Sequence, residues 1–343
     1  MTAKRPICPS CSSYLSPWGK TSSGKKRFRC KNCGITRIYH PNKNYTPDFF
    51  ELFRQYILWG FTYKALASLS SYSIQYLSFK FHGFLLKDPP ELPVVDQSNM
   101  DEAYLLIDGL WFGRWFVLMV YRQSKNLTIM HISTMGREVT TKISRDLVHL
   151  KALDYHFTGI VSDGGTGIVG AVNKVFPHIP HQICLAHMHR RIVSMLGKKP
   201  KDDRVKKLRI LADHVWLIES GEALKWWETE LKIWVRRNWW FIHEKRQDTD
   251  GRWWYIHKGV RKAARMLTIL PEISFTFLTH PTMPKTTNEL EAQFGHLGRR
   301  WIAHTGLKEE RWKGFLKWFV YFYNLEKLAV SKQKKDTKNN TTI

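Results

Sequence analysis

The chain has 343 residues, enough for two or three domains with a real hydrophobic core. It carries 54 lysines and arginines against 29 aspartates and glutamates, a formal net charge of +25. Such a charge is typical of proteins that bind nucleic acid, although a merely basic protein has the same composition. No apolar run approaches the ~18 residues of a membrane span, and MTAKRPICPS has no signal-peptide core. We therefore expect a cytoplasmic, nucleoid-associated protein.

Four of the five cysteines form two close pairs near the N-terminus, with eighteen residues between the pairs. Four thiolates brought together by a hairpin give the closed tetrahedral site of structural Zn²⁺. So short a segment needs the free energy of metal binding, on the order of 10 kcal/mol, in order to fold. We predict a zinc ribbon over 1–45 that holds one ion. Its four ligands are Cys8, Cys11, Cys30 and Cys33.

The predicted ribbon is basic, and its charges have two interpretations. They can lie along DNA phosphates, or they can simply be solvated. The residues concerned are Lys25, Lys26, Arg27 and Arg29.

Residues 46–95 predict a helix-turn-helix followed by a proline-rich linker. Apolar residues recur at helical spacing over 49–85, with breaks at Gly60 and in a serine-rich turn. Ser73 and Gln75 then begin the recognition helix, whose first residues reach base edges in such motifs. Three short helices can equally pack as a plain structural module, so DNA reading here is a hypothesis.

The periodicity changes to that of strands after the linker. The runs 103–112, 114–123 and 126–134 predict an antiparallel meander, and 141–153 predicts an amphipathic helix. The next stretch is GIVSDGGTGIVGAVNKVFPHIPHQICLAH (159–187), which predicts a strand, a helix and a second strand. This order of elements is that of the ribonuclease-H-like fold, a mixed α/β architecture.

Two aspartates fall where strand carboxylates can meet. Asp108 lies in the first strand, and Asp163 ends the fourth. If these strands are neighbours, the paired carboxylates need a cation, and oxygen ligands favour Mg²⁺ or Mn²⁺. Two such ions can activate an attacking oxygen and stabilise the leaving oxygen of a phosphodiester. The simpler explanation is that each Asp-Gly pair only makes a turn.

A third carboxylate stands on the helix predicted to begin near Thr287. Glu291 lies at the edge of the apolar stripe of this helix, and Gly295 and Gly298 leave space on its side. We expect Glu291 to be the third metal ligand, with Glu289 on the other flank as the alternative. The stripe itself consists of Leu290, Phe294, Leu297 and Trp301.

Residues 188–284 predict an all-helical insertion rich in tryptophan, and 331–343 a disordered tail. The tryptophans can form the core of the insertion, but adjacent pairs such as Trp239-Trp240 cannot both point inward. One member of each pair can stack on an unpaired base at a cleaved DNA end. Candidate phosphate contacts are Arg236, Arg237, Arg299 and Arg300.

Together these motifs resemble the Mutator-type DDE transposases of bacterial insertion sequences, over roughly 100–325. The resemblance implies a ribonuclease-H-like catalytic domain, formed by 100–187 and 285–330, which the helical insertion interrupts. It assigns the two Mg²⁺ (or Mn²⁺) ions to an Asp-Asp-Glu triad. The matching residues are Asp108 in LLIDG, Asp163 in VSDGG, Cys184-x-x-His187, Thr287-Asn288-x-x-Glu291 and the segment from His304 to Arg311.

The resemblance also implies Mg²⁺-dependent cleavage at element ends, then attack of the freed 3′-hydroxyl on target DNA. We expect the partners to be double-stranded transposon ends with terminal inverted repeats and target DNA, bound by a homodimer or higher oligomer. One alternative is a structure-selective nuclease or resolvase on the same fold. The other is a non-catalytic regulator that binds DNA through the ribbon and the helix-turn-helix.

Cys184 and His187 have two interpretations of their own. With His178, His181 and His189 close in sequence, they can ligate a metal. As matches to the C-x-x-H of the family, they are expected to be structural or to position DNA. Cys184 at the end of a buried strand also behaves as a small hydrophobe.

Overall fold

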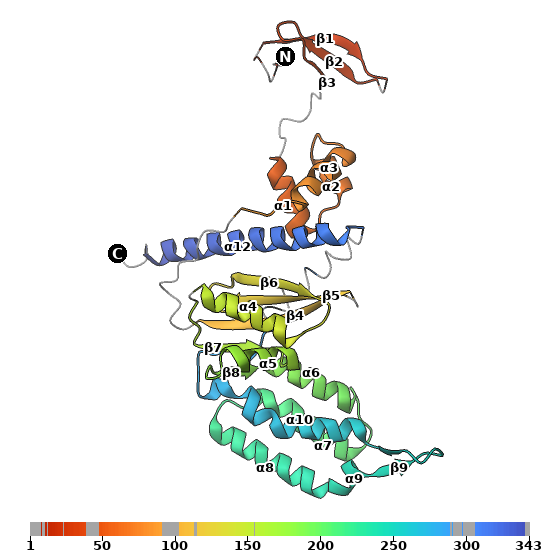
Figure 1. Cartoon of the computed structure of the whole chain (residues 1–343), viewed down its shortest axis with the longest axis vertical. Coiled ribbons are helices and arrows are strands. Elements are labelled where there is room, and N and C mark those ends of the chain that lie inside the picture. The colour runs from red at the N-terminus through yellow and green to blue at the C-terminus, as the bar shows by residue number, and fades with distance from the viewer. Residues whose placement is uncertain are drawn as a thin grey trace. The chain divides into compact units, whose positions relative to one another are not determined.

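The computed structural model divides into two compact units, Met1–Pro89 with Gly306–Phe319, and Pro90–Thr305 with Val320–Ile343 (Figure 1). None of the helices in the described part of the chain is both long and apolar enough to cross a bilayer. For 331–339 only the backbone is described. The described residues are 8, 11, 13–22, 24–38, 48–90, 103–112, 115–153, 155–288, 290, 297 and 306–339.

The first unit begins with a three-stranded antiparallel sheet of order β1-β2-β3. Its strands are short and largely exposed, and in the part of this region that the structure describes Leu15 is the one apolar residue besides the cysteines that is buried in its core cluster. Phe28 and Cys11 pack against that cluster from the side. So small an apolar core cannot hold a fold by itself. The strands are β1 (Leu15–Lys20), β2 (Lys26–Cys30) and β3 (Thr36–Ile38).

The three helices predicted over 49–85 are present. Each begins at a polar residue whose side chain accepts a hydrogen bond from a backbone N–H of the first turn, as N-caps do. Gly60 ends the first helix with a φ of 68°, a left-handed conformation that glycine adopts without strain. The helices are α1 (Phe49–Trp59), α2 (Tyr63–Leu69) and α3 (Ile74–Leu85).

Helix α12 (Glu309–Asn339) contributes its first turns to this unit. The indole N–H of Trp318 donates to the carbonyl oxygens of Phe84 and Lys87, at 2.9 and 3.0 Å. A Cβ on Gly314 would lie 1.7 Å from the carbonyl oxygen of Leu85, so only glycine permits this approach. The helix also continues into 331–343, where the sequence predicted disorder. The stretch it adds is rich in lysine and contains no glycine or proline to stop it.

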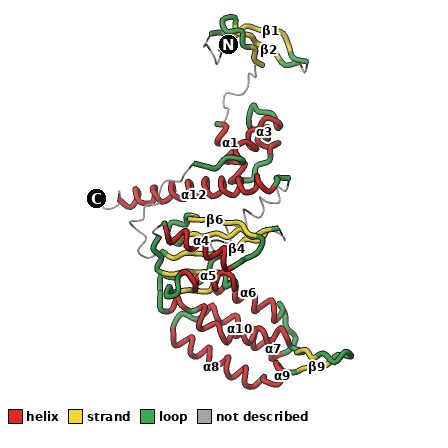
Figure 2. The backbone as a smooth tube through the Cα atoms, in the orientation of Figure 1, coloured by secondary structure: helices red, strands yellow, loops and turns green. Residues whose placement is uncertain are grey.

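The second unit is built on a mixed five-stranded sheet of order β6-β5-β4-β7-β8. Figure 2 draws the strands of this sheet in yellow and the helices in red. The first three strands form the predicted antiparallel meander, and the last two run parallel to β4. The strand that precedes Asp163 is therefore the neighbour of the strand that carries Asp108, as predicted. The strands are β4 (Tyr104–Phe112), β5 (Phe116–Gln123), β6 (Ile129–Met135), β7 (Gly159–Ser162) and β8 (His181–Ile183).

Two amphipathic helices, α4 (Thr140–Ala152) and α5 (Thr166–Val175), bury their apolar stripes against this sheet. Leu147 of α4 and Ile168 of α5 are completely buried there. The strand residues that face α4 and α5 are almost all apolar, which is typical of strands covered by helices. The core on the strand side contains Leu105, Ile107, Val117, Met119, Tyr121 and Ile160.

The insertion that follows β8 is mostly but not entirely helical, which corrects the all-helical prediction. Strands β9 (Lys245–Gln247) and β10 (Trp253–Tyr255) pair as an antiparallel hairpin. The Asp248 carboxylate accepts backbone N–H groups of Asp250 and Arg252 and stabilises the turn. These strands escaped prediction because they have no alternating apolar pattern.

The helices of the insertion share a core that contains two of the tryptophans. Trp227 donates its indole N–H to the carbonyl of Leu211, and Trp234 donates to that of Arg204. The helical elements are α6 (Leu185–Leu196), α7 (Asp203–Asp213), η2 (His214–Leu217), α8 (Gly221–Arg237), α9 (Trp239–His243), α10 (Lys258–Ser274) and η3 (Thr276–Leu278).

The chain returns from the insertion to the edge of the sheet beside β8. The buried Gln182 side chain donates to the carbonyl of Ser274 and accepts the N–H of Phe277. The N–H of Leu185 donates to the carbonyl of Lys285 at 3.1 Å. The segment 274–288 is thereby held next to the strands that carry the candidate site.

Candidate functional site

Asp108 and Asp163 occupy corresponding positions on adjacent parallel strands. Ile107 pairs with Ser162 in the register of β4 and β7, and the two aspartates are the next residues of the two segments. Asp108 is only 4% exposed, and its Oδ1 accepts the N–H of Gly109 at 2.8 Å. Asp163 Oδ1 accepts the N–H of Gly165 at 2.7 Å. Asp163 thus makes the turn-type hydrogen bond of the simpler interpretation, whereas Asp108 and Gly109 lie inside β4, where no turn forms.

A third carboxylate, Glu138, lies beside these strands just before α4. A Cβ on Gly109 would stand 2.6 Å from its Oε1, and a Cβ on Gly165 would stand 2.5 Å from its Oε2. Gly109, which follows Asp108, and Gly165, the second glycine after Asp163, therefore make room for this side chain. Sequence analysis missed Glu138 because a glutamate in a loop has no periodicity, and those glycines were assigned to turns.

The environment of Glu138 favours its neutral form. Burial raises the pKa of this carboxyl, and the negative charge of Asp163 raises it further. A hydrogen bond from Trp111 and the positive charges of His187 and Arg191 oppose the increase only in part. The carboxylates of Glu138 and Asp163 are therefore close enough to influence each other.

Thr287 connects the C-x-x-H motif to Asp108. Its hydroxyl donates to Asp108 Oδ2 at 3.1 Å and lies 3.4 Å from Cys184 Sγ, to which its N–H donates at 3.3 Å. All three residues are buried. Burial raises the pKa of the Cys184 thiol, but hydrogen bonds with His187 and Thr287 outweigh this effect and lower it. Two motifs that are a hundred residues apart in sequence thus meet at one carboxylate.

The remaining predicted site residues of this region are placed only in part. Asn288 lies in the described part of the chain, and its side chain is exposed. Leu290 and Leu297 are 1% exposed, as residues of the predicted apolar stripe should be. Glu291, its alternative Glu289, and the arginines Arg299 and Arg300 lie outside the described residues.

The histidines near Cys184 point to separate roles rather than to a metal site. His181 Nε2 lies 2.9 Å from Ser162 Oγ, and burial lowers the pKa of His181 to about 4. His189 pairs with Asp213 at 2.7 Å. In the described part of the chain, the N-terminal cysteines are the one group of three or more potential ligands whose atoms lie within 4.8 Å of one another. The ligand atoms of Cys184 and its neighbouring histidines do not lie that close together, and neither do those of Asp108, Asp163 and Glu138.

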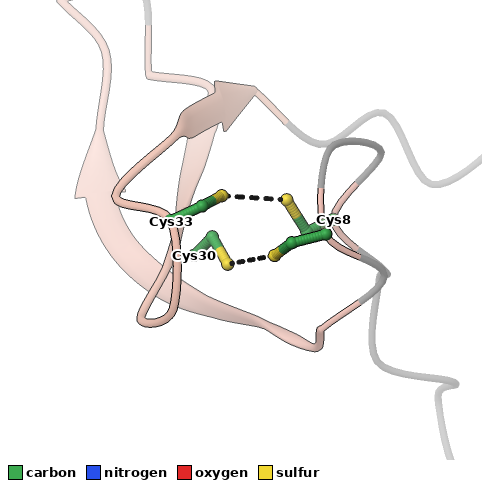
Figure 3. Close-up of side chains that lie close together, drawn as sticks. Cys8, Cys30 and Cys33 are labelled. Atoms are coloured by element: carbon green, nitrogen blue, oxygen red, sulfur yellow. Dashed lines mark hydrogen bonds between the residues drawn. The ribbon is translucent and has the colours of Figure 1, made fainter.

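The four N-terminal cysteines form a compact sulfur cluster (Figure 3). Cys8 Sγ lies 3.5 Å from Cys33 Sγ, and Cys11 Sγ lies 3.4 Å from Cys30 Sγ. Tetrahedral Zn²⁺ with Zn–S bonds of about 2.3 Å requires sulfur separations of roughly 3.8 Å. The donor set and its spacing therefore fit zinc, as the sequence predicted.

Hydrogen bonds prepare one of these sulfurs for metal binding. The side chain and backbone of Ser13 lower the pKa of Cys11 to about 6, with a smaller contribution from Cys30. A thiol with such a pKa is largely ionised at neutral pH, and thiolate is the form that binds metal.

The predicted DNA-binding residues of the first unit lie on its surface. Lys25, Lys26, Arg27 and Arg29 are all exposed, and the Arg29 guanidinium lies 4.7 Å above the Trp18 ring. Gln75 is exposed on the first turn of α3. Ser73 is engaged as the N-cap of this helix, because its Oγ accepts the N–H of Tyr76 at 3.1 Å.

A second surface of interest lies where α8 meets α9. Trp239 is 50% exposed and Trp240 86%, so neither member of this pair points inward. Arg236 and Arg237 are exposed beside them. The surface is hollowed into a cavity of about 590 Å³ that is lined by Glu228, Leu231, Lys232, Val235, Arg236, Trp239, Trp240 and Thr268.

Comparison with known proteins adds two similarities. A family model described as "Transposase, Mutator family" matches residues 136–238, which include Glu138, Asp163, Cys184 and His187. The transposase for insertion sequence element ISRM5 of Rhizobium meliloti (strain 1021) is 32% identical over 130 residues, which are 37% of this chain. The matched region covers 30% of the length of that relative.

Proposed function

We propose that this protein is a DNA transposase of the Mutator type with a ribonuclease-H-like catalytic domain. One observation carries the proposal: the region similar to Mutator transposases contains Asp163, and the register of β4 and β7 makes Asp108 its neighbour. The strand order β6-β5-β4-β7-β8, with an insertion after β8, supports the ribonuclease-H-like assignment. Transposition of DNA by strand cleavage and strand transfer follows from this assignment.

In this proposal Asp108, Asp163 and Glu291 hold two Mg²⁺ or Mn²⁺ ions. Their carboxylate oxygens are the donors that such ions prefer, and the bound ions supply activation of an attacking oxygen and stabilisation of a leaving oxygen. Thr287 lies against Asp108, and Glu291 follows four residues later in the sequence. That spacing supports Glu291 as the third ligand.

The chain itself orients the reacting groups. The N–H groups of Gly109 and Gly165 each hold one oxygen of an aspartate. Glu138 adds a further carboxylate beside Asp163, where it can accept a proton or bond a water. The buried position of Asp108 excludes bulk water from this part of the site.

Recognition of element ends belongs, in this proposal, to the zinc ribbon and the helix-turn-helix. Exposed cationic side chains on β2, such as Lys26 and Arg27, can lie along phosphates. Gln75 at the start of α3 can reach a base edge, whereas Ser73 supports the helix as its cap. The phosphate contacts supply affinity, and the helix supplies sequence preference.

The cavity between α8 and α9 is the proposed site for an unpaired base at a cleaved end. Trp239 and Trp240 offer exposed ring faces, and Lys232 and Arg236 offer charge for the adjoining phosphate. Between 188 and 284 there are 20 lysines and arginines against 11 aspartates and glutamates, which favours a polyanion on this domain. A Trp240→Ala variant should join ends more slowly and still bind intact duplex.

The decisive experiment uses labelled duplexes made from the DNA that flanks the gene. With Mg²⁺, the full-length protein should cut the element ends and join them to a target. Asp108→Asn and Asp163→Asn should bind these ends and neither nick nor join them. Asp203→Asn, which removes an exposed carboxylate that pairs with Lys206, is the matched control and should remain active.

The two alternatives give different results in the same assay. A structure-selective nuclease or resolvase cuts without forming joined products. For a non-catalytic regulator, Asp108→Asn leaves every measured property unchanged, and this result would remove the proposed chemistry altogether.

A further inference from the structure

We propose that Thr287, supported by Cys184, is a positioning residue that fixes the carboxylate of Asp108 for catalysis. The proposal rests on the proposed function, in which Asp108 is a metal ligand. It also gives a role to the C-x-x-H motif, since Cys184 reaches the site through Thr287 rather than as a ligand.

Both carboxylate oxygens of Asp108 receive a hydrogen bond from a different part of the fold. Oδ1 accepts the N–H of Gly109 on the same strand, and Oδ2 accepts the hydroxyl of Thr287 on the segment that returns from the insertion. Because Asp108 is 4% exposed, bulk water competes weakly for these positions. Two donors on separate elements fix the rotation of the carboxylate, which a single donor leaves free.

Thr287 is in turn held by Cys184 at the start of α6. The backbone N–H of Thr287 donates to the sulfur at 3.3 Å, and its hydroxyl lies 3.4 Å from the same sulfur. The single hydroxyl proton can serve only one acceptor at a time. When it serves Asp108, the backbone N–H of Thr287 still donates to the Cys184 sulfur, so Cys184 continues to hold Thr287 in place.

The neighbouring backbone reinforces this arrangement. The N–H of Leu185 donates to the carbonyl of Lys285, which ties the residue after Cys184 to the segment just before Thr287. Thr287 and Cys184 are both completely buried. A buried hydroxyl held at two points has little freedom to follow a moving carboxylate, so it sets the carboxylate orientation.

Loss of a partner that orients a metal ligand commonly costs 10- to 100-fold in metal affinity or activity. Thr287→Val keeps the shape of the side chain and removes the hydroxyl, whereas Thr287→Ser keeps the hydroxyl. We expect Thr287→Val to weaken Mn²⁺ binding by about 10- to 100-fold. Thr287→Ser should restore an affinity close to that of the unsubstituted protein.

The test titrates the full-length protein with Mn²⁺ and follows bound ion by electron paramagnetic resonance, alongside cleavage of the labelled ends. Thr282→Val is the matched control, because the Thr282 hydroxyl lies 2.7 Å from the Tyr104 hydroxyl instead of contacting a carboxylate. It should leave Mn²⁺ affinity unchanged. Unchanged affinity in Thr287→Val, or equal losses in Thr287→Val and Thr287→Ser, would overturn the positioning role.

Asp108→Asn separates this proposal from the function on which it rests. If Asp108→Asn binds Mn²⁺ and cleaves DNA like the unsubstituted protein, the proposed function fails. If it loses both while Thr287→Val keeps both, the function stands and the positioning role fails. Should Thr287→Val not fold, as judged by circular dichroism, Cys184→Ala removes the supporting sulfur and should lower Mn²⁺ affinity in the same direction. Unchanged affinity in Cys184→Ala would then overturn the role of Cys184.

Discussion

Among the described residues, the core of the N-terminal ribbon contains three that are buried, Cys8, Leu15 and Cys30, whereas the core between the five-stranded sheet and its two helices contains thirteen. Two of the three ribbon residues are themselves potential metal ligands. The ribbon therefore depends on coordination where the sheet depends on burial of apolar surface. The ribbon, to which we assign the recognition of ends, and the sheet, to which we assign the chemistry, therefore have separate sources of stability. Each should unfold without the other.

The sharpest test of this comparison is removal of the metal. Chelation should unfold the ribbon, because its stability comes from binding free energy on the order of 10 kcal/mol, and leave the sheet intact. Zinc content and amide resonances of the ribbon report the first effect, and thermal unfolding of the sheet reports the second.

The fifth cysteine supplies the control for metal removal. Cys184→Ser should leave one zinc ion per chain, since Cys184 lies outside the sulfur cluster. If the ribbon keeps its folded resonances after complete removal of zinc, its fold does not depend on metal coordination.

A large-to-small substitution in the sheet core should produce the next largest effect. Leu147→Ala on α4 removes a completely buried side chain and should lower the free energy of unfolding by about 2–5 kcal/mol. Its neighbour Val148 is 54% exposed, so Val148→Ala should change this free energy by less than about 0.5 kcal/mol. Denaturant unfolding measures both. A lower zinc content in Leu147→Ala would contradict the separate stability of the ribbon and the sheet.

Acid should weaken the sheet through His181. Burial lowers the pKa of this histidine from its ordinary value of 6.5 to about 4, so the unfolded chain binds the proton more readily. The resulting stability is fully present above pH 6.5 and declines as the pH falls toward about 4. The difference in pKa between the folded and unfolded chain contributes about 3 kcal/mol to the free energy of unfolding at neutral pH.

Chemical denaturation between pH 4 and 7 checks this dependence. The change in the free energy of unfolding between pH 4 and 7 should be smaller in His181→Asn, by about 3 kcal/mol. His178→Asn, at an exposed position, should show the same change as the unsubstituted chain. Parallel profiles for the unsubstituted chain and His181→Asn would show that His181 is not the titrating group.

The smallest effect on stability, and a clear one on binding, is expected from the basic face of the ribbon. Arg27→Ala removes an exposed charge and should change stability by less than about 0.5 kcal/mol. If Arg27 contacts a phosphate, the slope of log K against log salt for duplex DNA should fall by about 0.9. Lys142→Ala, at an exposed position on α4, should leave the slope unchanged. An unchanged slope in Arg27→Ala would favour the solvated-charge interpretation.

Much of this fold follows from local patterns in the sequence. Alternating and continuous apolar runs predicted β4, β5 and β6, and Gly60 and the serine-rich turn delimited the helices of the first unit. The hairpin β9-β10 was missed because its strands are polar or exposed and its turn depends on Asp248, whose hydrogen bonds have no periodic signal.

The candidate site was predictable where it follows strand order and not where it depends on packing. Asp108 and Asp163 could be paired from the expected topology alone. The contacts of Glu138 and Thr287 depend on how a loop and a returning segment lie on the sheet, which no spacing in the chain encodes. Glu138, and the contact of Thr287 with Asp108, were therefore not predicted from the sequence.

The hydrogen bond from Leu185 to Lys285 means that the insertion leaves and rejoins the sheet at nearly the same point. A hundred residues thus span a gap that a short loop could close, and the core that contains Trp227 and Trp234 stabilises them from within. Such a module can be lengthened, shortened or exchanged with little effect on the register of the strands. The end of β8 is accordingly a natural place to insert a different domain, or to delete the present one and retain the sheet.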